Sequence, residues 1–329
     1  MLVFADLVAD RFLTGRPRRI SREAPVLILE LEDDRLLPGG GANAVANIRA
    51  LGGVPLVFGV VGDDPNGAAL CEELARRDVD ISRIHRRPGY ITPTKTRILG
   101  GGVTGIKQQV VRLDTGQPQP ADEAERGALL EALRRDLAGK GASPPVVVLS
   151  DYGYGTVDPD LLARVRALVG PESIVLVDSR YRLGDYRDLS AATPNQEEAE
   201  ALCGHSLDDD ADMLRAGPRI LERLGGEFLL VTRGSRGMAL FLRNRFALFV
   251  PVHGGDQVAD VTGAGDTVIG MLALALAAGA TPAEAAILAN YAGGVVVMKL
   301  GTATVSPAEL QSAVSAGANS LGELRWVEC

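Results

Sequence analysis

The segment Asp260-Val-Thr-Gly-Ala-Gly-Asp266-Thr-Val-Ile-Gly270 joins a turn of small residues to a long apolar run over 267–278. The apolar run predicts a buried helix that begins at the turn. The first backbone N–H groups of a helix are unpaired and carry partial positive charge, so Gly263, Ala264 and Gly265 are predicted to form an anion hole. The two glycines let the backbone approach an anion without a Cβ clash.

Asp266 follows the predicted anion hole directly, where a carboxylate can accept the proton of a hydroxyl that attacks a phosphoryl group. Because a helix N-terminus lowers the pKa of a nearby carboxyl group, we expect Asp266 to be ionised at neutral pH. It would then be a weak base that orients the hydroxyl and accepts the proton late. On these residues alone, a tight turn before an ordinary helix start explains the pattern equally well.

Runs of Val, Leu and Ile alternate with helical patterns along the chain. Each run is bounded by Gly, Pro or Asp and has the composition of a strand buried on both faces. Such alternation predicts βαβ units, so we expect an α/β fold with a mostly parallel sheet between two layers of helices. The predicted strands are 54–61, 145–149, 174–177 and 228–231, and the predicted helices are 42–51, 66–77, 159–169, 197–202 and 213–224. Capping boxes at Thr281–Glu284 and Ser306–Glu309 predict two further helix starts.

Two regions interrupt this alternation with strand-like patterns that have no helix between them. They span about 12–36 and 90–114, and we expect them to form a small β-sheet that covers one edge of the main sheet as a lid. An ordinary edge hairpin is the alternative. Gly100–Gly105 matches a dinucleotide-binding pattern, but the strand-like segment 107–113 follows it where a helix is required, so a hairpin turn is predicted. Without repeats or a linker, residues 1–329 are expected to form one domain with this lid.

The composition excludes several classes of function. A formal net charge of −8 argues against general binding to nucleic acid or to an anionic membrane. The most apolar region, 267–298, is divided by Gly279, Pro282 and Glu284, so its halves are too short to span a bilayer. The three cysteines have no metal-like spacing and no signal peptide is recognised, so we expect a cytoplasmic protein.

Polar residues near the N-terminus are suited to bind a hydroxylated ligand. Gly40, Gly41 and Asn43 open a predicted helix; the glycines allow close approach, and the Asn43 amide has both a donor and an acceptor. Asp6 and Asp10 end the first predicted strand, and ligands of open α/β sheets bind at the carboxyl ends of strands. Turn and cap residues are the alternative interpretation at each of these positions.

Four motifs occur in the order in which ribokinase-like (pfkB) carbohydrate kinases carry them, and the chain resembles that family over nearly its whole length. The motifs are Gly39-Gly-Gly-Ala-Asn43, Thr193-Pro-Asn195-x-x-Glu198, Thr232-x-Gly234-x-x-Gly237 and Asp260–Asp266. The resemblance implies a ribokinase-like fold, ATP and Mg²⁺ as cofactors, Asp266 as the catalytic base and residues 263–265 as the anion hole. It also implies that Asn195 and Glu198 organise Mg²⁺ and the phosphates, largely through water. The residues implied to border the nucleotide are Thr232, Gly234, Gly237, Asn290 and Gly293.

A closer resemblance is to kinases that phosphorylate D-glycero-D-manno-heptose 7-phosphate in lipopolysaccharide-core synthesis. The similar segments are Asp10-Arg-Phe12, Arg19–Val26, Thr94-Lys-x-Arg97, Gln108–Asp114, Ser150-Asp-Tyr152 and Gly293–Pro307. This resemblance implies transfer of the γ-phosphoryl group of ATP to an anomeric hydroxyl that Asp10, Asn43 and Asp151 hold. Cations should meet the phosphate that such a substrate already carries. The candidates are Lys95, Arg97, Lys107, Arg112 and Arg180.

Other functions remain open at this point, and the chain departs from these kinases where the sugar would bind. Tyr154 and Arg180 stand where lysines are common, and Ala5 precedes Asp6 where glycine is usual. The alternatives are a kinase of another sugar, sugar phosphate or nucleoside, a dinucleotide-dependent oxidoreductase, and a sensor without activity. No H-x-G-H motif of a nucleotidyltransferase domain is present, so kinase activity alone is expected. The exposed edge of the lid sheet predicts pairing with a second copy as a homodimer.

Overall fold

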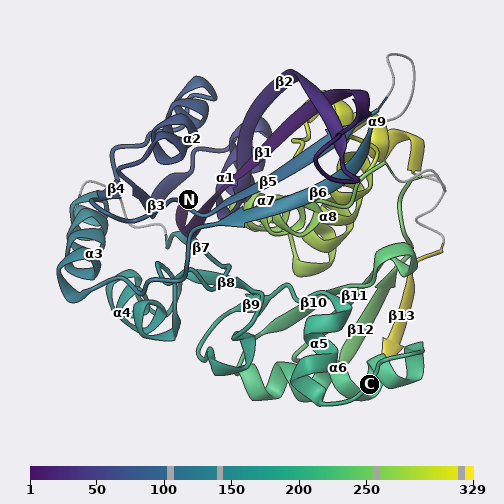
Figure 1. The fold of residues 1–329 in the computed structure, drawn as a ribbon. Helices are drawn as coiled ribbons and strands as arrows, with labels where there is room; N and C mark the ends of the chain where they lie inside the picture. The colour runs from purple at the N-terminus through teal and green to yellow at the C-terminus, as the bar shows by residue number, and fades with distance from the viewer. Residues whose placement is uncertain (102–106, 139–143, 255–258, 318–322) are drawn as a thin grey trace.

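The computed structural model describes residues 1–101, 107–138, 144–254, 259–317 and 323–329 (Figure 1). The strands are β1 Leu2–Ile20, β2 Leu27–Gly40, β3 Leu56–Gly62, β4 Ile84–Arg87, β5 Thr94–Gly100, β6 Gln108–Thr115, β7 Val146–Asp151, β8 Ile174–Ser179, β9 Ala191–Ala192, β10 Phe228–Thr232, β11 Met238–Leu242, β12 Phe246–Val250 and β13 Arg325–Glu328. The α-helices are α1 Gly41–Ala50, α2 Pro65–Arg76, α3 Glu123–Ala138, α4 Pro159–Val169, α5 Gln196–Cys203, α6 Asp210–Leu224, α7 Ala264–Ala277, α8 Pro282–Val296 and α9 Pro307–Ala316.

The main sheet runs in the order β13-β12-β11-β10-β9-β8-β7-β1-β3-β4. The pairs from β10 to β4 are parallel, and the pairs from β10 to β13 are antiparallel. The predicted α/β fold with a mostly parallel sheet is therefore confirmed. The strands and helices predicted from alternation are all present, within a few residues of their expected bounds.

Strands β11, β12 and β13 and helix α3 were not predicted. Strands β11 and β12 are short apolar runs of five residues each, and runs of that length do not distinguish a strand from a buried helix. Helix α3 buries Leu129, Leu130 and Leu133, a spacing that does favour a helix. The antiparallel end of the sheet is thus the part of the fold that the hydrophobic pattern leaves ambiguous.

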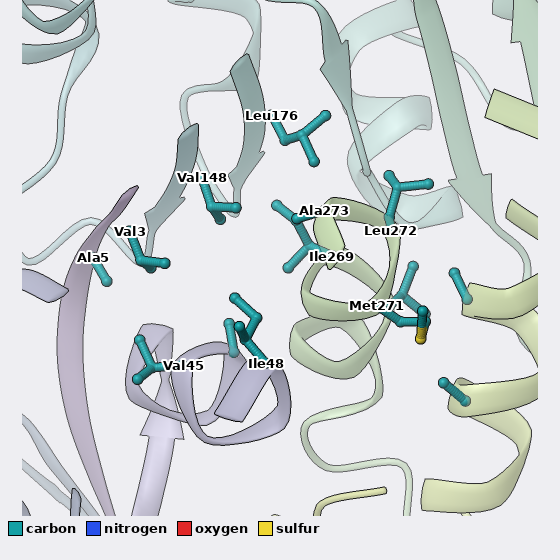
Figure 2. Packing of buried hydrophobic residues seen from close by; sticks show 14 of the residues in the cluster. Val3, Ala5, Val45, Ile48, Val148, Leu176, Ile269, Met271, Leu272 and Ala273 are labelled. Atoms are coloured by element: carbon teal, nitrogen blue, oxygen red, sulfur yellow. The ribbon is translucent and has the colours of Figure 1, made fainter. Parts of the chain in front are cut away.

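Helices cover both faces of the main sheet, and alternate strand residues point to them. On β1, Val3 packs in a core with α1, α2, α7 and α8, whereas Phe4 packs in a second core with α3, α4, α5 and α6. Figure 2 shows the first core, where Ile48 of α1 and Ile269 of α7 meet the strand residues. The three layers are therefore confirmed. None of the described helices is long and apolar enough to cross a membrane.

Strand β1 is long enough to belong to two sheets. Its first half pairs with β3 and β7 in the main sheet, and its second half pairs with β2 and β5 in a small sheet that β6 completes. Strands β5 and β6 form the predicted antiparallel hairpin. The glycine-rich turn predicted between them lies largely at 102–106, outside the described residues. Asp10 lies where β1 leaves the main sheet and enters the small one.

The helices begin in two different ways. Helices α8 and α9 begin with the predicted capping boxes, and aspartate side chains cap α2, α4 and α6. In contrast, α1 and α7 follow Gly40 and Gly263, which have positive φ values of 51° and 80° and provide no side-chain cap. The first N–H groups of α1 and α7 therefore remain available to a ligand.

Candidate active site

A cavity of about 410 Å³ opens where the middle of β1 and the carboxyl ends of β7 and β8 meet the start of α7. The lining residues that the sequence predicted are Asp10, Gly40, Lys95, Arg97, Arg112, Asp151, Arg180, Asn195, Glu198, Thr232, Gly263, Gly265 and Asp266. The other lining residues are Tyr152, Asp178, Thr193, Val261, Thr262 and Thr302. One cavity therefore brings together the predicted base, four of the five predicted cations and part of the predicted nucleotide site.

Asp266 is the third residue of α7, and only 2% of its surface is exposed. The hydroxyl of Tyr152 donates a hydrogen bond to Oδ1 of Asp266 at 2.7 Å, and Nδ2 of Asn43 donates to Oδ2 at 3.0 Å. The carboxylate is thus held from two sides, by the loop after β7 and by α1. Each oxygen has a further lone pair, so Asp266 can still accept a proton from a ligand in the cavity.

The expectation that the helix start keeps the pKa of Asp266 low is wrong. Burial raises the pKa of this carboxyl to about 7, although the hydrogen bonds from Tyr152 and Asn43 lower it. Repulsion by Asp10 adds to the increase, and attraction to Lys95 opposes it. Loss of hydration therefore outweighs the two side-chain hydrogen bonds that favour the ionised carboxylate. A pKa in this range suits the predicted role of Asp266 as a base, because proton acceptance is most efficient near the pKa.

Gly263 has a left-handed backbone because the chain turns sharply into α7. A Cβ on this residue would lie 2.3 Å from Nδ2 of Asn43, so a side chain does not fit. The same Nδ2 atom donates to the Gly263 carbonyl at 3.3 Å, which ties the turn to α1. Gly263 and Gly265 line the cavity, whereas Ala264 does not. The predicted anion hole thus faces the cavity through its two glycines.

Asp10 and Arg97 form a buried ion pair at the start of the small sheet, with Oδ1 and Nη1 2.6 Å apart. Arg97 also lies over the ring of Phe12, 5.3 Å from its centroid. Lys95, on the same strand, has neither a hydrogen bond nor an ion pair within the part of the chain that the structure describes, and lies 5.1 Å from the ring centroid of Tyr152. Burial lowers the pKa of Lys95. Among the described residues, Lys95 is therefore a cation without an ion-paired carboxylate, in contrast to Arg97.

The remaining predicted cations lie at the rim of the cavity or outside it. Arg112 lines the cavity and forms a two-point ion pair with Asp114. Lys107 pairs with Glu32 at 2.9 Å and does not line the cavity. Arg180 lines the cavity, is exposed, and has no ion pair with any described residue. Arg112 and Arg180 are thus the rim cations that a ligand can reach.

Asp151 lines the cavity, but its carboxylate already accepts several hydrogen bonds. The donors are the Ser179 and Tyr186 hydroxyls, the Arg182 guanidinium and the Gly153 N–H group, at 2.8 to 3.2 Å. Asp151 therefore holds together the loops that follow β7 and β8. Its predicted contact with a substrate hydroxyl stays a prediction.

Asp6 does not line the cavity. Its carboxylate accepts the backbone N–H groups of Tyr152, Tyr154 and Thr156 at 2.8 to 3.0 Å. Burial, together with repulsion by Asp151, raises the pKa of Asp6 to about 6. Of the two interpretations of Asp6, the geometry favours the turn residue over the ligand-binding one.

Asn195 and Glu198 line the cavity at the start of α5 and form a capping box with each other. Burial raises the pKa of Glu198, and burial with repulsion by Glu198 and Asp266 raises the pKa of Asp178 well above its usual range. A cation between these carboxyl groups would relieve their repulsion. Within the described residues, no group of three or more His, Cys, Asp or Glu side chains could hold a metal directly. The predicted contact of Asn195 and Glu198 with Mg²⁺ through water stays a prediction.

Among the residues predicted to border the nucleotide, Thr232 alone lines the cavity. Gly234 and Gly237 have positive φ values of 56° and 74° and turn the chain between β10 and β11. Asn290 lies at a separate, small cavity, where its Nδ2 donates to the Pro251 carbonyl at 2.8 Å. The nucleotide contacts of these residues stay predictions.

Two more predicted glycines are explained by packing. A Cβ on Gly41 would lie 2.4 Å from Cβ of Ala5, so this glycine allows α1 to lie close to β1. A Cβ on Gly293, in α8, would be in ordinary contact with Val268 of α7 at 3.4 Å. Neither glycine lines the cavity. Their predicted ligand contacts are not tested by this packing.

Several polar cavity residues were not predicted as site residues. Tyr152 follows β7 and Asp178 lies near the end of β8, so both occupy the carboxyl ends of strands, which is the signal that could have identified them. Thr193 and Thr302 have buried hydroxyl groups without a hydrogen-bond partner in the described part of the chain. A bound polar ligand is the simplest partner for these two hydroxyls.

Comparison with known proteins assigns the chain to a protein family. Residues 5–111 and 164–309 match the pfkB family carbohydrate kinase description. The bifunctional protein HldE of Trichlorobacter lovleyi is 40% identical over 316 residues, which are 95% of this chain and 62% of that protein. The protein of the same name from Halorhodospira halophila is 42% identical over 321 residues, 96% of this chain and 64% of that protein. The chain thus spans less than two thirds of the length of these relatives.

Solved structures give the same fold. Phosphofructokinase-2 from Escherichia coli, in complex with substrates and products, has a TM-score of 0.75 and 20% identity, over 96% of this chain and 98% of that chain. Ribokinase from Arabidopsis thaliana, complexed with ribose and ATP, has a TM-score of 0.72 and 20% identity, over 95% and 97%. The predicted ribokinase-like architecture is therefore confirmed.

Proposed function

Because the chain belongs to the pfkB family of carbohydrate kinases, we propose that it transfers the γ-phosphoryl group of ATP to the anomeric hydroxyl of D-glycero-D-manno-heptose 7-phosphate. Membership of the family makes the chain a sugar kinase, a phosphotransferase with an alcohol group as acceptor. Identity of about 40% with HldE proteins supports a heptose phosphate as that acceptor.

The observation that carries this proposal is Asp266 beside the uncapped start of α7, facing the cavity. A sugar hydroxyl hydrogen-bonded to Asp266 loses its proton to that carboxylate as the hydroxyl oxygen attacks phosphorus. The new oxygen–phosphorus bond forms while the bond to the departing ADP oxygen breaks. N–H groups at Gly263–Gly265 stabilise the negative charge on the transferred group.

The reaction also requires a binding site for ATP with Mg²⁺, and Asn195, Glu198 and Asp178 support such a site. These oxygen donors line the cavity and are of the kind that Mg²⁺ prefers. When bound there, Mg²⁺ supplies positive charge to the phosphate oxygens. Arg180 adds a permanent cation at the same part of the cavity.

Lys95, Arg97 and Arg112 support a substrate that already carries a phosphate. All three project from strands β5 and β6 of the small sheet into the cavity lining. Lys95 has no carboxylate partner among the described residues, and the Arg112 guanidinium can exchange the Asp114 carboxylate for a phosphate with the same two-point geometry. This concentration of cations favours a sugar phosphate over a free sugar.

A substrate panel tests the acceptor. We expect the ratio kcat/KM for heptose 7-phosphate to exceed that for the same heptose without its phosphate by at least about 100-fold, because charge-assisted contacts are lost. Hexose 6-phosphates and ribose complete the panel, and ADP release with product analysis is the readout. Preference for a free sugar would overturn the proposed acceptor and leave the kinase assignment intact.

We also propose that two copies pair through the small sheet. Leu27, Leu31 and Val110 of this sheet are 45%, 61% and 52% exposed and line an apolar groove of about 340 Å³. The outer edge of β6 has no strand partner among the described residues. A second copy would cover both features. Light scattering should then give twice the chain mass of 34.5 kDa, and Val110→Glu should give the single mass; a single mass for the unmodified protein would contradict the pairing.

A further inference from the structure

Tyr152 contacts the base directly, yet the transfer step described above assigns it no task. Its hydroxyl donates to Oδ1 of Asp266 at 2.7 Å, the shorter of the two side-chain hydrogen bonds to that carboxylate. The side chain enters the cavity from the loop after β7, whereas Asp266 enters from α7. Two elements far apart in the sequence thus meet at a single oxygen atom.

We propose that Tyr152 is a positioning residue that holds the carboxylate of Asp266 in the orientation and charge state needed to accept the proton of the sugar. This inference rests on the proposed sugar-kinase reaction and adds a residue to it. Tyr152 does not itself receive the proton in this account. It acts through Asp266.

The position of Tyr152 is held by contacts with Asp6 of β1, Lys95 of β5 and Gly40 of β2. Asp6, buried in β1, accepts the backbone N–H group of Tyr152 at 3.0 Å and two further N–H groups of the same loop. Lys95 lies over one face of the ring, 5.1 Å from the centroid. A Cβ on Gly40 would lie 3.3 Å from Cδ2 of the ring, so glycine leaves room for it. Because the ring is held in place, its hydroxyl group orients the Asp266 carboxylate and does not move with it.

The direction of the hydrogen bond follows from the environment of the two groups. Burial and the negative charge of Asp266 raise the pKa of Tyr152 well above its usual range, so its hydroxyl keeps its proton and donates it. A donor stabilises the ionised form of a carboxyl group, and this donor opposes the effect of burial on the pKa of Asp266. After Asp266 accepts the sugar proton on a free lone pair, the Tyr152 hydrogen bond weakens, because its acceptor is then neutral.

Other charged groups also face Asp266, and their effects on its pKa must be separated from the effect of Tyr152. Asp10 on β1 repels the carboxylate, Lys95 on β5 attracts it, and Asp178 on β8 repels it. All three remain when Tyr152 is replaced by Phe, and the phenyl ring keeps the contacts with Lys95 and Gly40. The Tyr152→Phe variant therefore removes one hydroxyl and little else.

The test compares the pH dependence of kcat/KM for the wild type and Tyr152→Phe, with heptose 7-phosphate and ATP. We expect the acidic limb of the variant to move to higher pH by about one unit, since a charge-assisted hydrogen bond is lost. We also expect kcat at the optimum to fall about tenfold, because the carboxylate loses its fixed orientation. Tyr154→Phe is the matched control, because it removes a hydroxyl group from the same loop. The Tyr154 hydroxyl makes no hydrogen bond with Asp266, so the acidic limb of this variant should coincide with that of the wild type.

A second measurement does not depend on the sugar. Infrared titration of the buried carboxyl group in the free enzyme, assigned by its loss in Asp266→Asn, should show the same upward shift in Tyr152→Phe. A shift in this titration without turnover of any sugar would support Tyr152 and contradict the proposed function. An unchanged titration and an unchanged acidic limb in a folded Tyr152→Phe protein would overturn the inference, even if its activity were reduced.

Discussion

Asp266, at the α7 end of the cavity, and the Arg112–Asp114 pair, at its small-sheet end, hold their charges in opposite ways. At the α7 end, Asp266 is 2% exposed, and its hydrogen-bond donors, Tyr152 and Asn43, are both neutral. At the small-sheet end, Arg112 and Asp114 pair with each other, and their side chains are 43% and 46% exposed. The Asp266 carboxylate is therefore desolvated and forms no ion pair with a described residue, whereas the rim cation is solvated and already neutralised.

In the proposed reaction, the buried end performs the chemistry and the exposed end selects the sugar. Interactions of a buried charge are strong, and groups fixed in advance need no rearrangement during the reaction. An exposed ion pair contributes only about 0–1 kcal/mol, so Arg112 can leave Asp114 for a phosphate at little cost. Substitutions at the α7 end should therefore lower kcat, and substitutions at the small-sheet end should raise KM.

The largest effect is expected for Asp266→Asn, which removes the base and keeps its shape. We expect kcat to fall by about 1,000-fold or more, measured as ADP release with saturating substrates. Stability should not fall with it. The folded chain holds a proton on Asp266 between the usual pKa of 3.8 and about 7, so the stability contributed by this group decreases as pH rises through that window. The melting temperature of the variant at pH 8 should equal or exceed that of the wild type; a lower value together with full activity would contradict the assignment.

Gly263→Ala tests the anion hole at the same end. We expect kcat to fall about 100-fold, because the new Cβ would displace Asn43 and the N–H groups that stabilise the transferred charge. Gly279→Ala is the matched control, since Gly279 has a φ of 90° just after α7 and no atom within 4 Å of a Cβ built there. Both variants carry backbone strain of about 1 kcal/mol. Equal losses of activity in the two would show that strain alone is responsible.

The pH dependence of kcat/KM in the wild type tests whether burial determines the pKa of Asp266. Because Asp266 must be ionised to accept a proton and its pKa is about 7, kcat/KM should fall about tenfold for each pH unit below 7. At pH 5 the loss should be about 100-fold. Constant kcat/KM between pH 5 and 8 would mean that the carboxyl group is ionised throughout, as the helix-end argument alone predicted.

The fold could be predicted because its signals are local and redundant. Buried parallel strands such as Ile174–Ser179 are continuous apolar runs, and capping boxes such as Thr281–Glu284 define a helix start within four residues. The strands β11 and β12 could not be separated from buried helix segments, because an apolar run of five residues fits either element. The spacing of apolar residues indicates whether a segment forms a helix or a strand, whereas the position of a strand in the sheet depends on which strands it pairs with.

The site was predictable to the extent that each group has a sequence motif. The small residues 263–265 predict the start of α7, and the position of Asp266 directly after them predicts its place at the site. Its pKa did not follow, because desolvation depends on everything that covers the carboxylate, including Tyr152 from another motif. Asp6 was ambiguous for the same reason: a carboxylate at the end of a strand can face a ligand or a loop, and here it faces the loop.

The smallest effect is expected at the rim, where Arg112→Ala should raise KM for the sugar phosphate about tenfold and leave kcat nearly unchanged. Arg11→Ala is the matched control. Arg11 forms the same two-point ion pair with Asp34 on the small sheet, with side chains 38% and 36% exposed, and it does not line the cavity. Steady-state kinetics with varied sugar phosphate at saturating ATP separates the two variants. If Arg112→Ala lowered kcat as strongly as Gly263→Ala, the rim would share in the chemistry, and the division between the two ends would be wrong.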